Sequence, residues 1–108
     1  MRTTTYFSVA VLLVASLTLA APKEKTFLGN ISDDMCGLKH EMAGKTSAEC
    51  TLECVKMGGK YVLADTVNRK VYKLSDQERP QQFAGQKVKV TGTLQGDTIH
   101  VASIVAAE

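Results

Sequence analysis

The residues best suited to chemistry in this sequence are three cysteines and a histidine that lie close together along the chain. Cys36, Cys50 and Cys54 are all the cysteines of the protein, and His40 lies between the first two. Thiolate and imidazole groups are the ligands that zinc and copper(I) prefer, and a structural zinc site takes four ligands. One interpretation is therefore a zinc or copper site formed by Cys36, His40, Cys50 and Cys54.

A disulfide bond is the second interpretation, and the sequence favours it. Cys36 would bond to Cys50 or Cys54, and closing a loop of this size stabilises a small domain by about 3 kcal/mol. A bond between Cys50 and Cys54, one helical turn apart, would add little and suits disulfide geometry poorly. Redox catalysis is a third interpretation, which Glu49 and Glu53 oppose because nearby negative charge raises the pKa of a thiol.

Two acidic residues, Asp33 and Asp34, lie directly before this cluster. In the metal interpretation, either one would hydrogen-bond a ligand from outside the coordination sphere. They do not predict an acid and base pair, because adjacent side chains in a turn diverge. The sequence contains no nucleophile elbow and no phosphate-binding loop, so we expect no enzymatic activity.

The elements that must position these residues are mostly strands. Alternation and turn residues predict a first strand that leads into a Cys-bearing helical insert at 33–59. Two strands, a short helix and a final hairpin follow. The expected ranges are strand 26–32, helix 47–57, strands 60–65 and 70–74, helix 75–84, and a hairpin over 88–101. The fold class is mainly β, a small five-stranded OB-like barrel, with a five-stranded sheet or small sandwich as the alternative.

The first twenty residues have the pattern of a secretory signal peptide rather than of a folded element. Arg2 supplies a positive start, residues 6–19 carry no charge, and Thr18 and Ala20 place small side chains before a cleavage site. The apolar run is shorter than the roughly 20 residues that span a membrane. We therefore expect export to the periplasm or beyond, with no stable membrane insertion after cleavage.

Cleavage would leave one small domain with nearly balanced charge. Residues 21–25 form a flexible lead-in, and 26–108 form a single domain. The 13 Lys and Arg residues become 12 once Arg2 is removed, against 11 Asp and Glu residues. A net charge near +1 gives no concentrated basic surface, so we expect no nucleic-acid partner.

Several motifs together carry a resemblance to a known family. They are the G-x-I-x-D-x-x-C-G run at 29–37, the C-x3-C pair at 50–54, the segment Gly-Gly-Lys-Tyr-Val-Leu at 58–63, and the final hairpin. In these motifs the chain resembles a family of small bacterial exported proteins of unknown function. The resemblance implies an exported bacterial OB-like domain and no particular activity. If that family has a site, the matching positions here are Cys36, His40, Cys50 and Cys54.

Two functions remain open from the sequence. The favoured one is an exported, non-catalytic binding or structural module of the cell envelope, with its insert held by a disulfide. The alternative is a zinc- or copper-binding protein that uses the Cys and His cluster. The sequence identifies no ligand or partner.

Overall fold

The computed structural model describes residues 23–39 and 43–107, and in these residues the protein is mainly β. These described residues form five strands, one α-helix and one 3-10 helix, which confirms the predicted mainly-β class and the number of strands. The elements are β1 (Lys25–Asp33), α1 (Ser47–Lys56), β2 (Tyr61–Asp65), β3 (Lys70–Leu74), η1 (Arg79–Phe83), β4 (Lys87–Gln95) and β5 (Thr98–Ala106).

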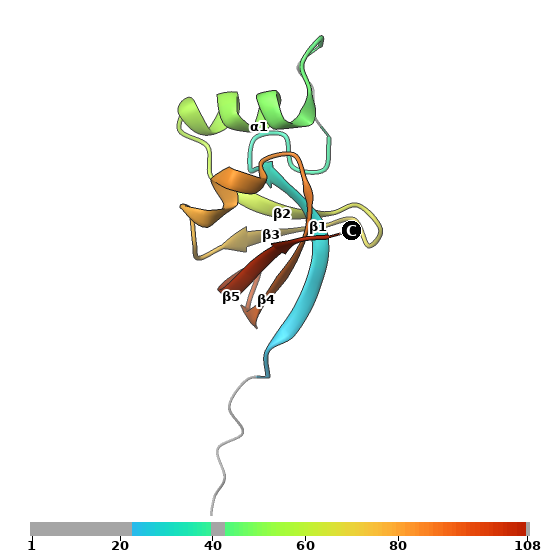
Figure 1. Ribbon diagram of the computed structural model, residues 1–108, viewed down its shortest axis with the longest axis vertical. Coiled ribbons are helices and arrows are strands. Elements are labelled where there is room, and N and C mark those ends of the chain that lie inside the picture. The colour runs from blue at the N-terminus through green and yellow to red at the C-terminus, as the bar shows by residue number, and fades with distance from the viewer. Residues whose placement is uncertain (1–22, 40–42, 108) are drawn as a thin grey trace, which may run out of the picture.

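The five strands form a sheet that closes in a ring, in the order β1-β2-β3-β5-β4 (Figure 1). Strand β1 is shared between two neighbours, since its first part pairs with β4 and its last part pairs with β2, both antiparallel. Gly29 lies where β1 passes from one partner to the other. A Cβ there would approach the Ala64 carbonyl oxygen to 2.6 Å. The backbones therefore meet closely at this position, as the glycine in the predicted strand indicated.

The core lies inside the ring and follows from the alternation of the strands. On β4, Val88 and Val90 are buried while Lys87 and Lys89 point outward. The buried cluster takes large apolar residues from all five strands, together with one alanine from the loop before β4. Its members are Ile31, Tyr61, Leu63, Leu74, Ala84, Val88, Val90, Ile99 and Ile104.

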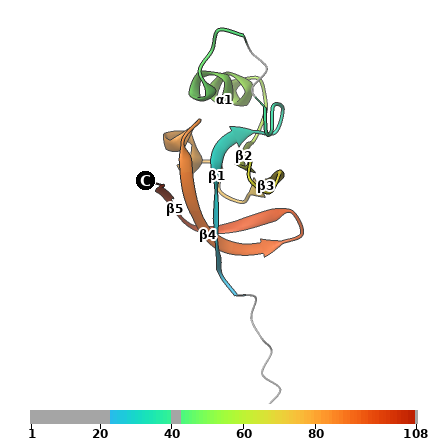
Figure 2. The ribbon, with the colours of Figure 1, turned by 90° about the vertical axis from the view of Figure 1, so that its right-hand side faces the viewer.

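Helix α1 lies across one end of the ring, opposite the end where β1 begins (Figures 1 and 2). It begins after Thr46, whose hydroxyl accepts a hydrogen bond from the Glu49 amide at 3.2 Å. Leu52 and Val55 pack against the core, so the helix closes this end of the ring. The predicted insert therefore packs onto the sheet through α1.

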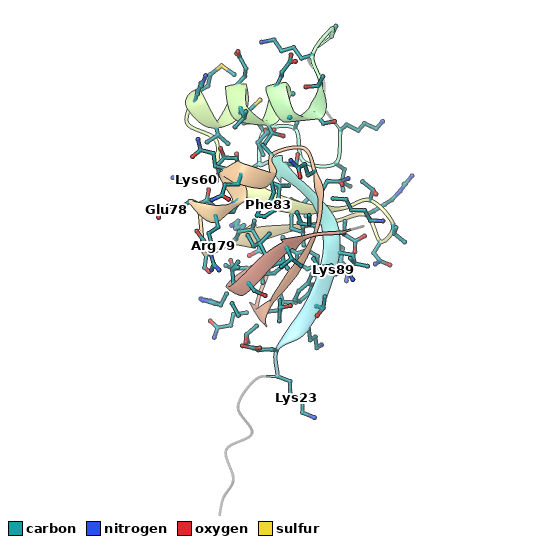
Figure 3. All side chains as sticks on the ribbon, viewed as in Figure 1. Lys23, Lys60, Glu78, Arg79, Phe83 and Lys89 are labelled. Carbon is teal, nitrogen blue, oxygen red and sulfur yellow. The ribbon has the colours of Figure 1, made fainter. Side chains whose placement is uncertain are left out.

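The 3-10 helix η1 occupies part of the segment in which a short helix was predicted. Arg79 and Phe83, at its two ends, are labelled in Figure 3. The Arg79 guanidinium donates to the Ala102 carbonyl at 3.1 Å, which attaches η1 to β5. No helix in the described parts of the chain is long and apolar enough to cross a membrane. The predicted signal peptide, residues 1–20, lies outside the described residues.

Candidate metal centre

The first half of the site is built where β1 ends. Asp33 is the last residue of β1, and its side chain is fully buried. Its Oδ2 accepts hydrogen bonds from the Met35 amide at 3.0 Å and the Cys36 amide at 2.9 Å. An aspartate that accepts amides two and three residues later is the usual start of a tight turn. The turn brings Cys36 back beside the carboxylate that holds it.

The second half of the site is one face of α1. Cys50 and Cys54 are one helical turn apart, so their side chains lie on the same face of the helix. Their exposed fractions are 0% and 2%. The end of the helix is fixed by the Gly59 amide, which donates to the Cys54 carbonyl at 3.0 Å. The burial of both thiols shows that this face of the helix points into the protein.

The two halves meet in a compact group of four donor atoms. Cys36 Sγ lies 3.6 Å from Cys50 Sγ and 3.8 Å from Cys54 Sγ. A carboxylate oxygen of Asp33 and the three sulfurs all lie within 4.8 Å of one another. Two thiolates on a tetrahedral zinc ion, each about 2.3 Å from the metal, lie about 3.8 Å apart. The observed sulfur separations match that spacing closely.

No disulfide is formed among the described residues, which include every cysteine of the chain. The closest pair of sulfurs is 3.6 Å apart, whereas a disulfide bond is about 2.05 Å long. The disulfide predicted between Cys36 and either Cys50 or Cys54 is therefore not formed in this structure. The sulfurs are arranged as a cluster in which Cys36 contacts both others.

The electrostatics of the cluster favour a bound cation. Burial is the main cause that raises the pKa of the Cys54 thiol from 9.0 to about 12; hydrogen bonding with Cys36, the negative charge of Asp33 and hydrogen bonding with the Asp33 carboxylate add to it. Asp33 Oδ1 is buried and has no hydrogen-bond partner of ordinary geometry in the described structure, with the Cys54 thiol beside the carboxylate. A buried carboxylate oxygen without a donor is costly. A metal ion would supply positive charge to both groups.

The other predicted site residues lie apart from this group or outside the described structure. Asp34 is exposed, and its Oδ1 accepts a hydrogen bond from the Lys60 amide at 2.9 Å, which ties the turn to the start of β2. His40 lies outside the described residues. Asp33 was predicted only as a hydrogen-bonding residue, and the structure places its carboxylate among the sulfurs. The Asp-x-x-Cys spacing carried a signal for the turn but none for a fourth donor.

Three lysines labelled in Figure 3 are spread over the molecule. Figure 3 labels Lys23 before β1, Lys60 before β2 and Lys89 on β4, and the three lie in different parts of the molecule. Among the described residues, Asp33, Cys36, Cys50 and Cys54 are the group of Cys, His, Asp and Glu side chains that could hold a metal ion.

The comparisons with known proteins concern the sheet more than the centre. No curated protein and no solved structure matches the chain. The match that was found begins at Val55, after Cys54, and so leaves out all four donor residues and the G-x-I-x-D-x-x-C-G motif. It covers β2, β3, β4 and β5. Residues 55–107 match the model of the family described as "Protein of unknown function (DUF5818)".

Proposed function

We propose that this protein binds one zinc ion through the Asp33 carboxylate and the thiolates of Cys36, Cys50 and Cys54. The observation that carries the proposal is the spacing of the cluster, with sulfur atoms 3.6 and 3.8 Å apart beside a buried carboxylate. Three thiolates and one carboxylate make a complete tetrahedral set. Each residue already lies in its place through hydrogen bonds or helix packing.

Zinc fits this donor set better than copper. Copper(I) is selected by thiolate and thioether sulfur, whereas zinc accepts carboxylate oxygen together with thiolates. Oδ2 of the buried Asp33 already accepts two amides, whereas Oδ1 has no hydrogen-bond partner in the described structure. A zinc ion would contact Oδ1, whereas copper(I) bound to the three sulfurs alone would not.

The proposed role of the zinc ion is to hold the insert, not to catalyse a reaction. Structural zinc sites use four protein ligands, whereas catalytic sites keep a position open for water. Here four protein donors come together and three of them are almost fully buried. The ion would join the turn after β1 to α1, in place of the disulfide that the sequence favoured.

We propose that the domain around this centre is an OB-like barrel that acts as a binding or structural module of the cell envelope. The closed strand order β1-β2-β3-β5-β4, with a short parallel contact between β3 and β5, supports an OB-like topology. Here α1 lies between β1 and β2, and only the 3-10 helix η1 lies between β3 and β4.

Export remains part of the proposal and rests on residues 1–20 of the sequence. The full chain should be produced in a bacterium, and the intact mass of the protein in the periplasmic fraction should be measured. We expect a protein that has lost residues 1–20. A protein that keeps Met1 and stays in the cytoplasm would refute export and leave the zinc proposal intact.

Two neighbouring aspartates provide a matched test of the zinc site. Asp33 and Asp34 both accept backbone amides, but only Asp33 belongs to the cluster. Asn retains a side-chain carbonyl that accepts an amide, so D33N and D34N should both keep their turns. Zinc affinity should be measured by competition with a chromophoric chelator, and stoichiometry by elemental analysis.

We expect one zinc per chain in the wild type and in D34N. The D33N variant should bind zinc on the order of a hundredfold more weakly, because one ligand loses its charge. Equal affinities for D33N and D34N would remove Asp33 from the site. Less than half an equivalent of zinc in the wild type would refute the proposed function.

A further inference from the structure

The sulfurs of the metal centre are also close to disulfide geometry, with Cys36 as the common partner. Cys36 Sγ must approach Cys50 Sγ or Cys54 Sγ by only about 1.6 to 1.8 Å to reach bonding distance. A bond between Cys50 and Cys54 would join neighbouring turns of α1 and leave the turn after β1 unconnected. Both bonds that connect the turn to the helix therefore use Cys36.

We propose that this centre is regulated by oxidation, in which a low-molecular-weight disulfide converts Cys36 and one helix cysteine into a protein disulfide and zinc is released. The inference rests on the proposed function, because it requires zinc on these same side chains. It adds a second state of the centre and names the class of molecule that produces this state.

Accessibility determines where the oxidation begins. Asp33, Cys50 and Cys54 are almost completely buried, whereas Cys36 is only half-buried and lies on the turn at the surface. An oxidant from solution therefore meets Cys36 first. The two buried thiolates then compete for the sulfur of Cys36, and their similar distances allow either of them to complete the bond.

The electrons balance in two displacement steps. The Cys36 thiolate attacks a small disulfide, RSSR, which forms a mixed disulfide with Cys36 and releases one RS⁻. The thiolate of Cys50 or Cys54 then attacks the Cys36 sulfur and releases the second RS⁻. The two protein thiolates lose two electrons in total, and RSSR takes them up. Only one thiolate and the Asp33 carboxylate would then remain to hold zinc, whereas a structural zinc site takes four ligands.

The fold should persist in both states, because each state joins the same two elements. Zinc connects the turn after β1 to α1 through all four donors, and the disulfide connects them through Cys36 alone. Oxidation therefore replaces one cross-link with another. The expected result is release of the ion without unfolding of the sheet.

The experiment uses the full protein loaded with zinc and treated with oxidised glutathione. Released zinc should be followed with a chromophoric chelator, and the cysteine pairs should be mapped by mass spectrometry of non-reduced peptides. We expect the loss of one equivalent of zinc, and one intramolecular disulfide that contains Cys36. Circular dichroism should show the strand signal unchanged, and a thiol reductant should restore zinc binding.

Several outcomes would overturn the inference. These are zinc retained while the oxidant is in excess, a Cys50–Cys54 bond as the main product, a mixed disulfide that persists at Cys36, or a disulfide between two chains. The variant C36S, with its fold checked by circular dichroism, should form no intramolecular disulfide. If C36S does not fold, the peptide map of the wild type still decides the matter.

Failure of this inference is distinguishable from failure of the proposed function. A protein that holds no zinc before oxidation contradicts the proposed function. A protein that holds one zinc and keeps it through oxidation supports the proposed function and refutes the regulation.

Discussion

At the scale of single residues, the site depends on a carboxylate whose role the sequence did not reveal. The sequence puts Asp33 close to the cysteine cluster. An aspartate directly before a turn, however, is expected to cap that turn with its side chain. The structure shows that one oxygen does cap the turn and the other has no hydrogen-bond donor in the described structure. The different surroundings of the two Asp33 oxygens depend on tertiary packing, and the spacing of residues along the sequence does not reveal them.

A second carboxylate gives a prediction on pH. Hydrogen bonds from Arg79, first its side chain and also its amide, together with the Glu78 amide, lower the pKa of Asp76 below its ordinary value of 3.8. A lowered pKa in the folded state stabilises the protein above that ordinary value, and the contribution is lost as pH falls through the folded pKa. The D76N variant should therefore be less stable than the wild type at pH 7, by roughly 1 kcal/mol or less for a partly exposed pair.

The measurement is urea unfolding of the metal-free wild type and D76N at pH 7 and at pH 2. The difference in unfolding free energy should be smaller at pH 2 than at pH 7, because the contribution of a lowered pKa is lost as pH falls through the folded value. The variant D97N removes a more exposed carboxylate whose ion pair with Lys73 is 3.7 Å long, and it should change little at either pH. A D76N deficit of the same size at both pH values would contradict the assignment.

At the scale of elements, local patterns predicted the strands and tertiary contacts decided how they join. Strand β4 alternates clearly, and the Gly96-Asp97 turn indicates the hairpin with β5. The shift of β1 from β4 to β2 near Gly29 depends on partners more than thirty residues away, which no local pattern contains. The choice between a disulfide and a metal site was open for the same reason, because it depends on sulfur distances across the fold.

Gly85 gives a prediction on how α1 is seated. It has a φ of +73°, and a Cβ there would overlap the backbone of Ser47 and Ala48 at the start of α1. Gly44 has a similar φ of +78° but open space around it. G44A should therefore cost about 1 kcal/mol from the backbone conformation alone, whereas G85A should cost roughly 1–3 kcal/mol more from overpacking.

Thermal unfolding of the two variants with zinc bound measures this difference. The G85A variant should also bind zinc more weakly than G44A, because the helix that carries Cys50 and Cys54 must shift. Equal melting temperatures for the two variants would show that the start of α1 does not rest on Gly85.

At the scale of the whole molecule, the centre lies between a sheet that forms a ring and an insert that covers one of its ends (Figure 1). The family match covers the part of the sheet from β2 to β5 and excludes the donors. The apolar core inside the ring includes none of the four donor residues. The turn after β1 and the thiol-bearing face of α1, by contrast, meet at the metal centre. Zinc should therefore stabilise the insert more than the sheet.

Hydrogen exchange with and without a chelator tests this difference. Removal of zinc should speed exchange of the amides in α1 and in the turn at 34–39, while β4 and β5 keep their protection. Uniform loss of protection would mean that the whole fold depends on the metal. No change in α1 would mean that the metal does not hold the insert.

X-ray absorption at the zinc edge of the full protein tests the four-donor centre directly. We expect three sulfur neighbours at about 2.3 Å and one oxygen neighbour at about 2.0 Å, with no outer-shell scattering from an imidazole ring. Imidazole scattering would show that His40 takes the place proposed for Asp33. Fewer than three sulfur neighbours would contradict the four-donor centre formed by Asp33, Cys36, Cys50 and Cys54.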